Sequence, residues 1–292
     1  MRALALGARD SDSRGPPSPR FAQMGGDSDP SNKVKIALAM EMTKLFDVMK
    51  NTDASVEILL AMCFKLVDAN EQVDSALLSV MESLKDIAPL VEKNPGNAEK
   101  LLGLLQKFVD PASQTVSPEN WRLRRAVILA MAPVTKSLGV EKFEAELLQP
   151  YLNAFEDKIS EVRSAATDAV VGVKEAFGVE FVMAKILGPL KASYVKHTYF
   201  LNRVVTIDAF KSVLGATVDA GIAGEVFAFL VKGIEDPVPN VRFTTVRALG
   251  EGAEYATDAD VKTVIRPALD TAKNDSDADV AFFASEALKK LG

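Results

Sequence analysis

The stretch DPVPNVRFTTVRAL, residues 236–249, decides the fold of this chain, because related stretches recur along it. It begins as an acidic turn that contains two prolines, and it continues as an amphipathic run after Arg242. Arginines stand at the equivalent point of three earlier stretches, at intervals of 39 or 40 residues: Arg203, Arg163 and Arg124. One period further on, Ala281 replaces the arginine. A spacing that repeats over several periods indicates a tandem array.

Two further markers keep the same phase. The first marker is an alanine six residues after each of these positions. The second is a proline in the preceding apolar stretch, at Pro150, Pro189 and Pro267. Ala228 stands at the equivalent position of the period that lacks this proline. Each period has two apolar stretches with helical spacing. We expect the small residue to allow close helix contact and the proline to kink the first helix, because proline lacks the N–H of the helical hydrogen bond.

A single helix pair cannot bury its apolar faces, so the pairs are expected to stack on one another. The predicted fold is all-α: a right-handed α-solenoid of about six helix pairs with a period near 39, covering residues 32–292. Residues 54–69 and 70–88 form an early pair, residues 32–50 a lone helix that closes the end, and residues 110–118 a long turn. Residues 1–31 are rich in Gly, Pro, Ser and Asp without periodicity, and are expected to be disordered.

The composition excludes several functions. The 292 residues carry a net charge of −6, so the basic footprint of a nucleic-acid-binding protein is lacking. No apolar run approaches the length of a membrane helix. One histidine (His197) and one cysteine (Cys63) cannot form a multi-histidine or Cys/His metal centre, and no nucleotide-binding glycine motif is present. We expect no cofactor, no catalytic site, and a cytoplasmic or nuclear location.

The repeated arginine has a structural explanation. At the start of each second helix it can reach an acid in the turn of the neighbouring pair, and repetition of this contact makes a ladder of ion pairs. We call this series the arginine ladder; its expected members are Asp157, Arg163, Arg203, Asp236 and Arg242. Ala281 fits the scheme, since the last pair has no following neighbour.

The period and the D-x-x-x-x-V-R turns resemble the HEAT repeat. More specifically, NWRLRRAVI, HTYFLNRVVT, DPVPNVRFTTVRAL and DSDADVAFFASEAL are similar, in this order, to the last repeats of the scaffold (A) subunit of type 2A serine/threonine protein phosphatase. The resemblance covers about residues 60–292. It implies a non-catalytic scaffold that binds the phosphatase catalytic subunit along the turns inside its repeats. The family's N-terminal half is absent, which weighs against binding of a B-type regulatory subunit.

Carried over to this chain, the family's docking turns fall on eight residues: Trp121, Arg122, Lys158, Ser160, Tyr199, Phe200, Pro237 and Val238. Lys158 and Ser160 stand where the family has histidine and tyrosine, which points to an altered contact there. Independently of the family, Trp and Arg are enriched among interface hot spots. The alternatives are that Trp121 packs across the long turn and that Val238 is merely solvent-exposed.

A second function also fits the sequence. A helical-repeat adaptor for transport or trafficking would recognise an extended basic peptide through an acidic inner face, which the net charge of −6 permits. Such binding would be sensitive to salt and indifferent to changes at Trp121.

Overall fold

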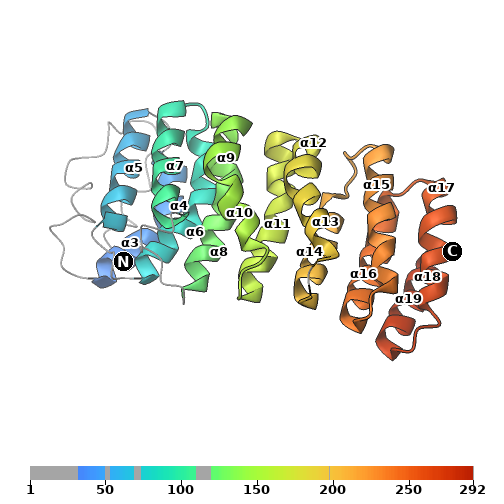
Figure 1. The fold of residues 1–292 in the computed structure, drawn as a ribbon. Coiled ribbons are helices and arrows are strands. Elements are labelled where there is room, and N and C mark those ends of the chain that lie inside the picture. The colour runs from blue at the N-terminus through green and yellow to red at the C-terminus, as the bar shows by residue number, and fades with distance from the viewer. Residues whose placement is uncertain (1–31, 50–52, 69–73, 110–119, 197, 292) are drawn as a thin grey trace. The chain divides into compact units, whose positions relative to one another are not determined.

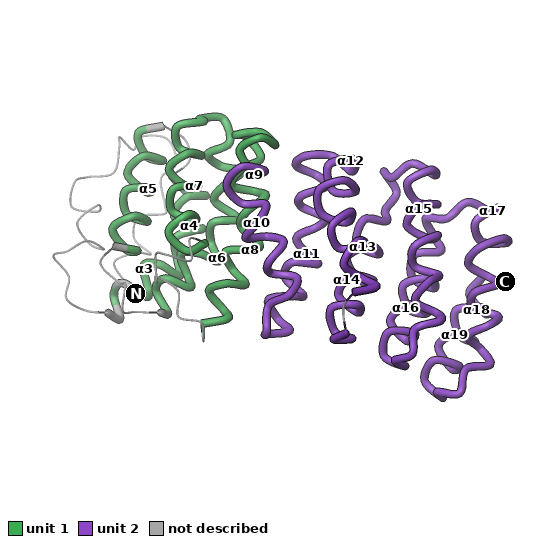
Figure 2. Tube along the Cα trace, in the orientation of Figure 1, with its two compact units in different colours: residues 1–143 green, residues 144–292 purple. Residues whose placement is uncertain are grey.

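A computed structural model describes residues 32–49, 53–68, 74–109, 120–196 and 198–291. Throughout these residues the regular elements are helices, so the chain is an all-α helical-repeat protein (Figure 1). It divides into two compact units, Met1–Phe143 and Glu144–Gly292 (Figure 2). The segment 1–31 expected to be disordered and the long turn 110–118 lie outside the described residues.

Unit 1 consists of helices that pack around α6, which contacts α3, α4, α5, α7 and α8. Apolar side chains such as Leu59, Met81 and Leu105 are completely buried between them. The expected lone helix over 32–50 is in fact two helices, because the Glu41 N–H bonds to the Leu38 carbonyl and tightens the chain there. The bounds are α3 Asn32–Met40, α4 Met42–Met49, α5 Asp53–Asp68, α6 Asp74–Val91, α7 Pro95–Val109, α8 Trp121–Thr135 and the short η1 Lys136–Leu138.

Unit 2 is a stack of helix pairs. Its second helices form one row, in which α11 contacts α14, α14 contacts α16 and α16 contacts α19. These four helices are α11 Ser160–Phe177, α14 Phe200–Val213, α16 Pro239–Gly252 and α19 Ala278–Lys290. The first helices are interrupted: α9 Val140–Glu146, which crosses the boundary between the units, α10 Leu148–Ala154, α12 Val179–Phe181, η2 Val182–Leu187, α13 Gly188–Tyr194, α15 Ala220–Leu230, η3 Val231–Glu235, α17 Asp258–Asp260, η5 Val261–Ile265 and α18 Arg266–Ala272, with η4 Ala253–Tyr255 after α16.

The in-phase prolines account for three of these interruptions. A π turn ends just before Pro189 and another just before Pro267, and the chain leaves α9 shortly before Pro150. Each proline removes the hydrogen bond that would tie it to the turn before it. Ala228 occupies the same slot in α15, which runs without a break from Ala220 to Leu230. The disturbance that the sequence predicts for the first helix therefore occurs where the proline is present.

Small residues allow the helices of unit 2 to approach closely. A Cβ added at Gly250 of α16 would lie 2.8 Å from the Cβ of Ala287 in α19, which is closer than two side chains can pack. A Cβ at Gly233 would lie 2.0 Å from the Thr245 Oγ1 atom. The second helices and the turns before them thus share one tightly packed core. Gly178, with φ of 93°, ends α11 in a conformation that favours glycine.

Candidate protein-binding site

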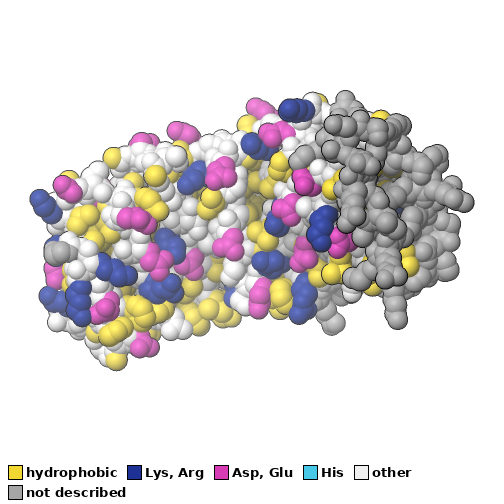
Figure 3. Space-filling model, turned by 180° about the vertical axis from the view of Figure 1, so that it is seen from behind, with side chains coloured by type: hydrophobic (Ala, Val, Ile, Leu, Met, Phe, Trp, Pro, Cys, Tyr) yellow, Lys and Arg dark blue, Asp and Glu magenta, His cyan; other side chains and the backbone are white. Residues whose placement is uncertain are grey.

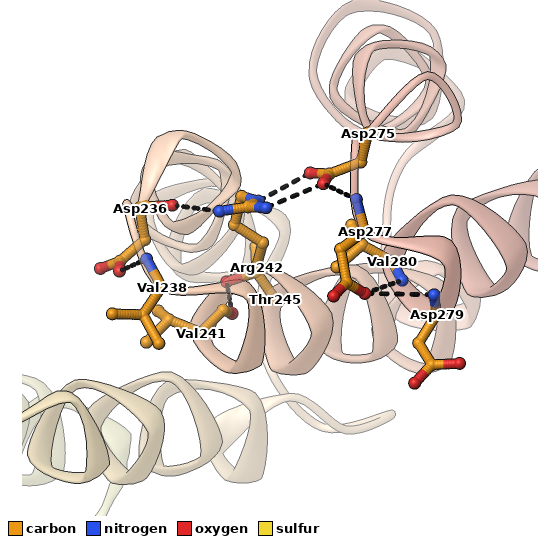
Figure 4. Close-up of polar contacts among 9 residues, drawn as sticks. All are labelled: Asp236, Val238, Val241, Arg242, Thr245, Asp275, Asp277, Asp279 and Val280. Carbon is orange, nitrogen blue, oxygen red and sulfur yellow. Dashed lines mark hydrogen bonds and ion pairs between the residues drawn. The ribbon is translucent and has the colours of Figure 1, made fainter.

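Three of the turns between the helices of a pair in unit 2, those before α11, α16 and α19, are built around an aspartate. The carboxylate accepts the backbone N–H two residues later: Ile159 N–H to Asp157 at 2.8 Å, Val238 N–H to Asp236 at 2.9 Å and Asp277 N–H to Asp275 at 2.8 Å. Figure 4 shows the last two of these turns. An aspartate in this role holds a turn in one conformation. The residues that follow it are therefore presented in a defined geometry.

Arginines on the second helices reach the aspartate of the following turn. Arg203 donates from Nε and Nη2 to the two carboxylate oxygens of Asp236, at 2.7 and 2.9 Å. Arg242 does the same with Asp275, at 2.6 and 2.8 Å (Figure 4). The side chains of both pairs are at most 13% exposed. Two parallel charge-assisted bonds of this kind fix the relative position of neighbouring turns.

A further bond ties the arginine to its own turn. The Nη1 group of Arg242 donates to the carbonyl of Asp236 at 2.9 Å, and that of Arg163 donates to the carbonyl of Asp157 at 2.7 Å. Arg242 thus joins two successive turns. Its hydrogen bonds to Asp275 hold the pKa of that carboxyl below its usual range, and the same bonds raise the pKa of the guanidinium. Both groups are charged at neutral pH.

Arg163 departs from the expected ladder. It bonds to its own turn, but it forms no ion pair with a carboxylate among the described residues, and its buried Nε has no hydrogen-bond partner. The sequence gives the reason. The aspartates stand three residues before the second helix, at Asp157, Asp236 and Asp275, whereas the position three residues before Phe200 is His197, which lies outside the described residues. The repeat that should supply the acid for Arg163 lacks it.

The docking residues expected in unit 2 belong to the same turns, which lie together at the lower end of the helix pairs in Figure 1. Lys158, Ser160 and Pro237 are exposed, and 56% of Tyr199 is accessible to solvent. Val238 and Phe200 are only partly exposed: Val238 caps α16, and the Phe200 ring lies 6.0 Å from that of Tyr199. We call the surface made by these six residues the turn row.

Trp121 and Arg122 belong to unit 1. Trp121 begins α8, where Asn120 caps the helix by accepting the Leu123 N–H at 3.2 Å. The Arg122 guanidinium lies 4.4 Å from the centre of the Trp121 ring, within the range of a cation–π contact. Trp121 is half-buried and Arg122 is exposed, so the pair presents part of an aromatic ring with a positive charge over it.

Sequence reasoning did not include Asp275 among the members of the arginine ladder. The spacing along the chain could have identified Asp275. Arg203 and Asp236 are separated by 33 residues, and Arg242 and Asp275 are separated by the same number. Sequence reasoning also did not single out Asp168 of α11 and Asp208 of α14, which line a groove between these two helices.

Other chemistry has little support in the part of the chain that the structure describes. It contains no group of three His, Cys, Asp or Glu side chains arranged to hold a metal ion. Cys63 is buried, and burial raises the pKa of its thiol to about 12, so the reactive thiolate is suppressed. None of the described helices is both long and apolar enough to span a bilayer. Figure 3 shows basic and acidic side chains interspersed over one face, without a field of one sign among the residues coloured there.

Comparison with known proteins yields structural neighbours of low sequence identity. No family model and no curated protein matches the sequence. A designed armadillo repeat protein is 18% identical, with 87% of this chain and all of that chain covered and a TM-score of 0.42. Two engineered proteins solved in a structural genomics programme are 16% and 17% identical, cover 87% of this chain and 96% and 98% of their own length, and give TM-scores of 0.42 and 0.41.

Proposed function

We propose that this chain is a protein-binding scaffold whose turn row docks the catalytic subunit of a type 2A-like serine/threonine phosphatase. The observation that carries the docking surface is the combination of exposed and immobilised residues in the turns. Tyr199 is more than half exposed, and the Asp236 carboxylate that orients the Val238 turn is itself held by Arg203.

Immobilised turns favour binding for a physical reason. A side chain that is already held in its bound position loses little conformational freedom when a partner docks, so more of the contact energy remains as affinity. Pro237 and Pro239 flank Val238 and restrict the backbone of that turn further. At the Val238 turn, the ladder and the prolines together therefore favour a rigid surface over a flexible loop.

The identity of the partner rests on the resemblance of the sequence to the phosphatase scaffold. The resemblance is residue-specific in the turns, where Trp121, Tyr199 and Val238 match positions of the family's docking surface. In this proposal the scaffold adds no chemistry of its own. It acts by holding the catalytic subunit and anything else bound to the chain at a high effective concentration.

The test is binding of the purified full chain to a purified type 2A catalytic subunit, measured by biolayer interferometry. Tyr199→Ala combined with Val238→Ala should weaken binding by about 30-fold or more, as expected for loss of interface hot spots. The matched control is Tyr255→Ala, because Tyr255 is exposed but lies at the other end of α16, after the helix. Trp121→Ala is tested in the same series.

Equal affinity of the double variant and the Tyr255 control would remove the turn row from the proposal. Failure of the unmodified chain to bind the catalytic subunit would reject this partner. Binding of basic peptides that is lost in high salt and unaffected by Trp121→Ala would instead favour the adaptor function.

A further inference from the structure

A groove of about 330 Å³ runs between α11 and α14, within unit 2. Its walls combine Arg163 and Asp168 of α11 with Asp208 of α14, together with small polar side chains such as Ser164 and Thr167. It begins beside Ser160, so it opens next to the turn row. The groove shares Ser160 with that row, but its other lining residues lie further along α11 and α14.

Arg163 occupies the end of the groove nearest the turns. The residue is 7% exposed, and its Nη1 group is already bonded to the Asp157 carbonyl. In Arg203 and Arg242 the Nε and Nη2 atoms together hold a carboxylate. Among the described residues, the same edge of Arg163 has neither a carboxylate nor any hydrogen-bond acceptor for its Nε. A buried donor without an acceptor is unfavourable, so this edge is suited to an acceptor from outside the chain.

The other end of the groove is acidic. Asp168 and Asp208 form no ion pair with any described residue, and the neighbouring Lys211 is bonded to Glu251 at 2.6 Å. Partial burial raises the pKa of Asp208, and the positive charges of Lys211 and Arg247 only partly oppose that effect. Both carboxylates thus line this end of the groove without an ion-pair partner among the described residues. A cation placed here would find two carboxylates.

We propose that this groove binds an extended segment of a partner protein that places an Asp or Glu carboxylate on Arg163 and a Lys or Arg between Asp168 and Asp208. Arg163 and Asp168 are five residues apart on one helix, a rise of about 7.5 Å. Side chains two residues apart in an extended chain lie on one face and are separated by about 7 Å. The first spacing to test is therefore an acid and a base at positions i and i+2 of the segment.

This inference is independent of the partner in the turn row, because it uses only groups inside the groove. In effect, the bound carboxylate takes the place of the aspartate that the turn before α14 lacks. Arg203 and Arg242 offer no such opening, since their carboxylates are supplied by the chain itself.

The test uses arginine Nε–H resonances in NMR spectra of the ¹⁵N-labelled full chain, titrated with the peptide acetyl-Gly-Glu-Ser-Lys-Gly-amide. The Arg163 resonance should shift to saturation, and those of Arg203 and Arg242 should stay in place. A peptide with glutamine at both charged positions should bind about tenfold more weakly, because it loses the charge-assisted bonds.

Variants separate recognition from loss of structure. Arg163→Lys keeps the charge but loses the planar fork, so it should weaken peptide binding about tenfold, measured by fluorescence anisotropy of the labelled peptide. Arg242→Lys is the matched control and should leave peptide binding unchanged; circular dichroism checks that both variants are folded. In the double variant Asp168→Asn and Asp208→Asn, the lysine of the peptide should no longer strengthen binding relative to glutamine at the same position. Equal binding of the charged and the glutamine peptides, or equal shifts at all three arginines, would overturn the proposal.

Discussion

The turns before α16 and α11 have the same design, but the arginines that follow them have different partners. Before α16, Asp236 orients its own turn, Arg203 binds its carboxylate, and Arg242 continues to Asp275. Before α11, Asp157 orients its turn and Arg163 binds its carbonyl, but the series stops there. We call the first arrangement the closed link and the second the open link.

The comparison shows that one repeated residue can have two roles. In the closed link an arginine is a structural bond between neighbouring helix pairs. In the open link the equivalent arginine keeps only the bond to its own turn and leaves a donor edge beside a groove. The difference arises one repeat away, at the turn that should supply the acid, and not at the arginine itself. Repetition makes the missing partner recognisable.

The largest expected effect is that of breaking the closed link. Arg242→Ala leaves the Asp275 carboxylate, whose side chain is 10% exposed, without its counter-charge, so the free energy of unfolding should fall by about 3 kcal/mol. Urea denaturation followed by circular dichroism measures the change. A loss below about 1 kcal/mol would be typical of an exposed surface pair and would contradict the closed link.

Arg163→Ala is the matched comparison in the open link. It removes one hydrogen bond to the Asp157 carbonyl and also removes a buried donor that has no acceptor. The expected loss is about 1 kcal/mol. If Arg163→Ala destabilised the chain as much as Arg242→Ala, the distinction between the two links would be wrong.

A second substitution disturbs the side-chain packing next to the closed link. Gly233→Ala places a Cβ 2.0 Å from the Thr245 Oγ1 atom, next to the turn that contains Asp236, and should cost about 2 kcal/mol. Gly103→Ala is the control, because nothing lies within 4 Å of its Cβ and alanine favours the helix. Unfolding in urea should therefore separate the two variants, with only Gly233→Ala destabilised; equal stability would contradict the close approach.

The open link can also be closed by design. His197→Asp introduces an acid at the position where the other turns have aspartate, and should stabilise the chain by about 1 kcal/mol. The gain should vanish when Arg163 is alanine, which a double-mutant cycle measures. A gain of the same size without Arg163 would show that the added acid acts in another way.

The smallest effect is a dependence on pH. The Arg242 hydrogen bonds lower the pKa of Asp275 in the folded chain, so its contribution to stability is present above the unfolded pKa of about 3.9 and is lost as pH falls through the lower folded value. The stability gap between the unmodified chain and Arg242→Ala should therefore narrow below about pH 4. The stability difference between the unmodified chain and Arg163→Ala is not expected to narrow in the same way below about pH 4. A gap for Arg242→Ala that stays constant down to about pH 2 would contradict the ion pair.

The helix pairs were predictable because the arginine, alanine and proline markers keep one phase along the sequence. The proline at position 189 predicts a lost hydrogen bond, but not the π turn by which the helix accommodates it, since that depends on the packing of the neighbouring pairs. The interruption between α3 and α4 at Glu41 depends on a local backbone hydrogen bond, and no residue pattern in the sequence predicts it.

For the site, the turns were predictable and the open link was not. The residues around Arg163 resemble those around Arg242 in the sequence. The two arginines can be distinguished only when each is assigned to the acid of the next turn, because Arg242 has such an acid and Arg163 does not. That assignment depends on the stacking of helices, which brings residues 33 positions apart into contact. The partner that docks on the turn row remains a prediction from resemblance.

The most direct test of the two links is NMR detection of scalar couplings across hydrogen bonds from arginine Nε to carboxylate carbon in the isolated full chain. The account predicts couplings from Arg203 to Asp236 and from Arg242 to Asp275, and none from Arg163. A coupling from Arg163 to any carboxylate of the chain, or the absence of both predicted couplings, would contradict it.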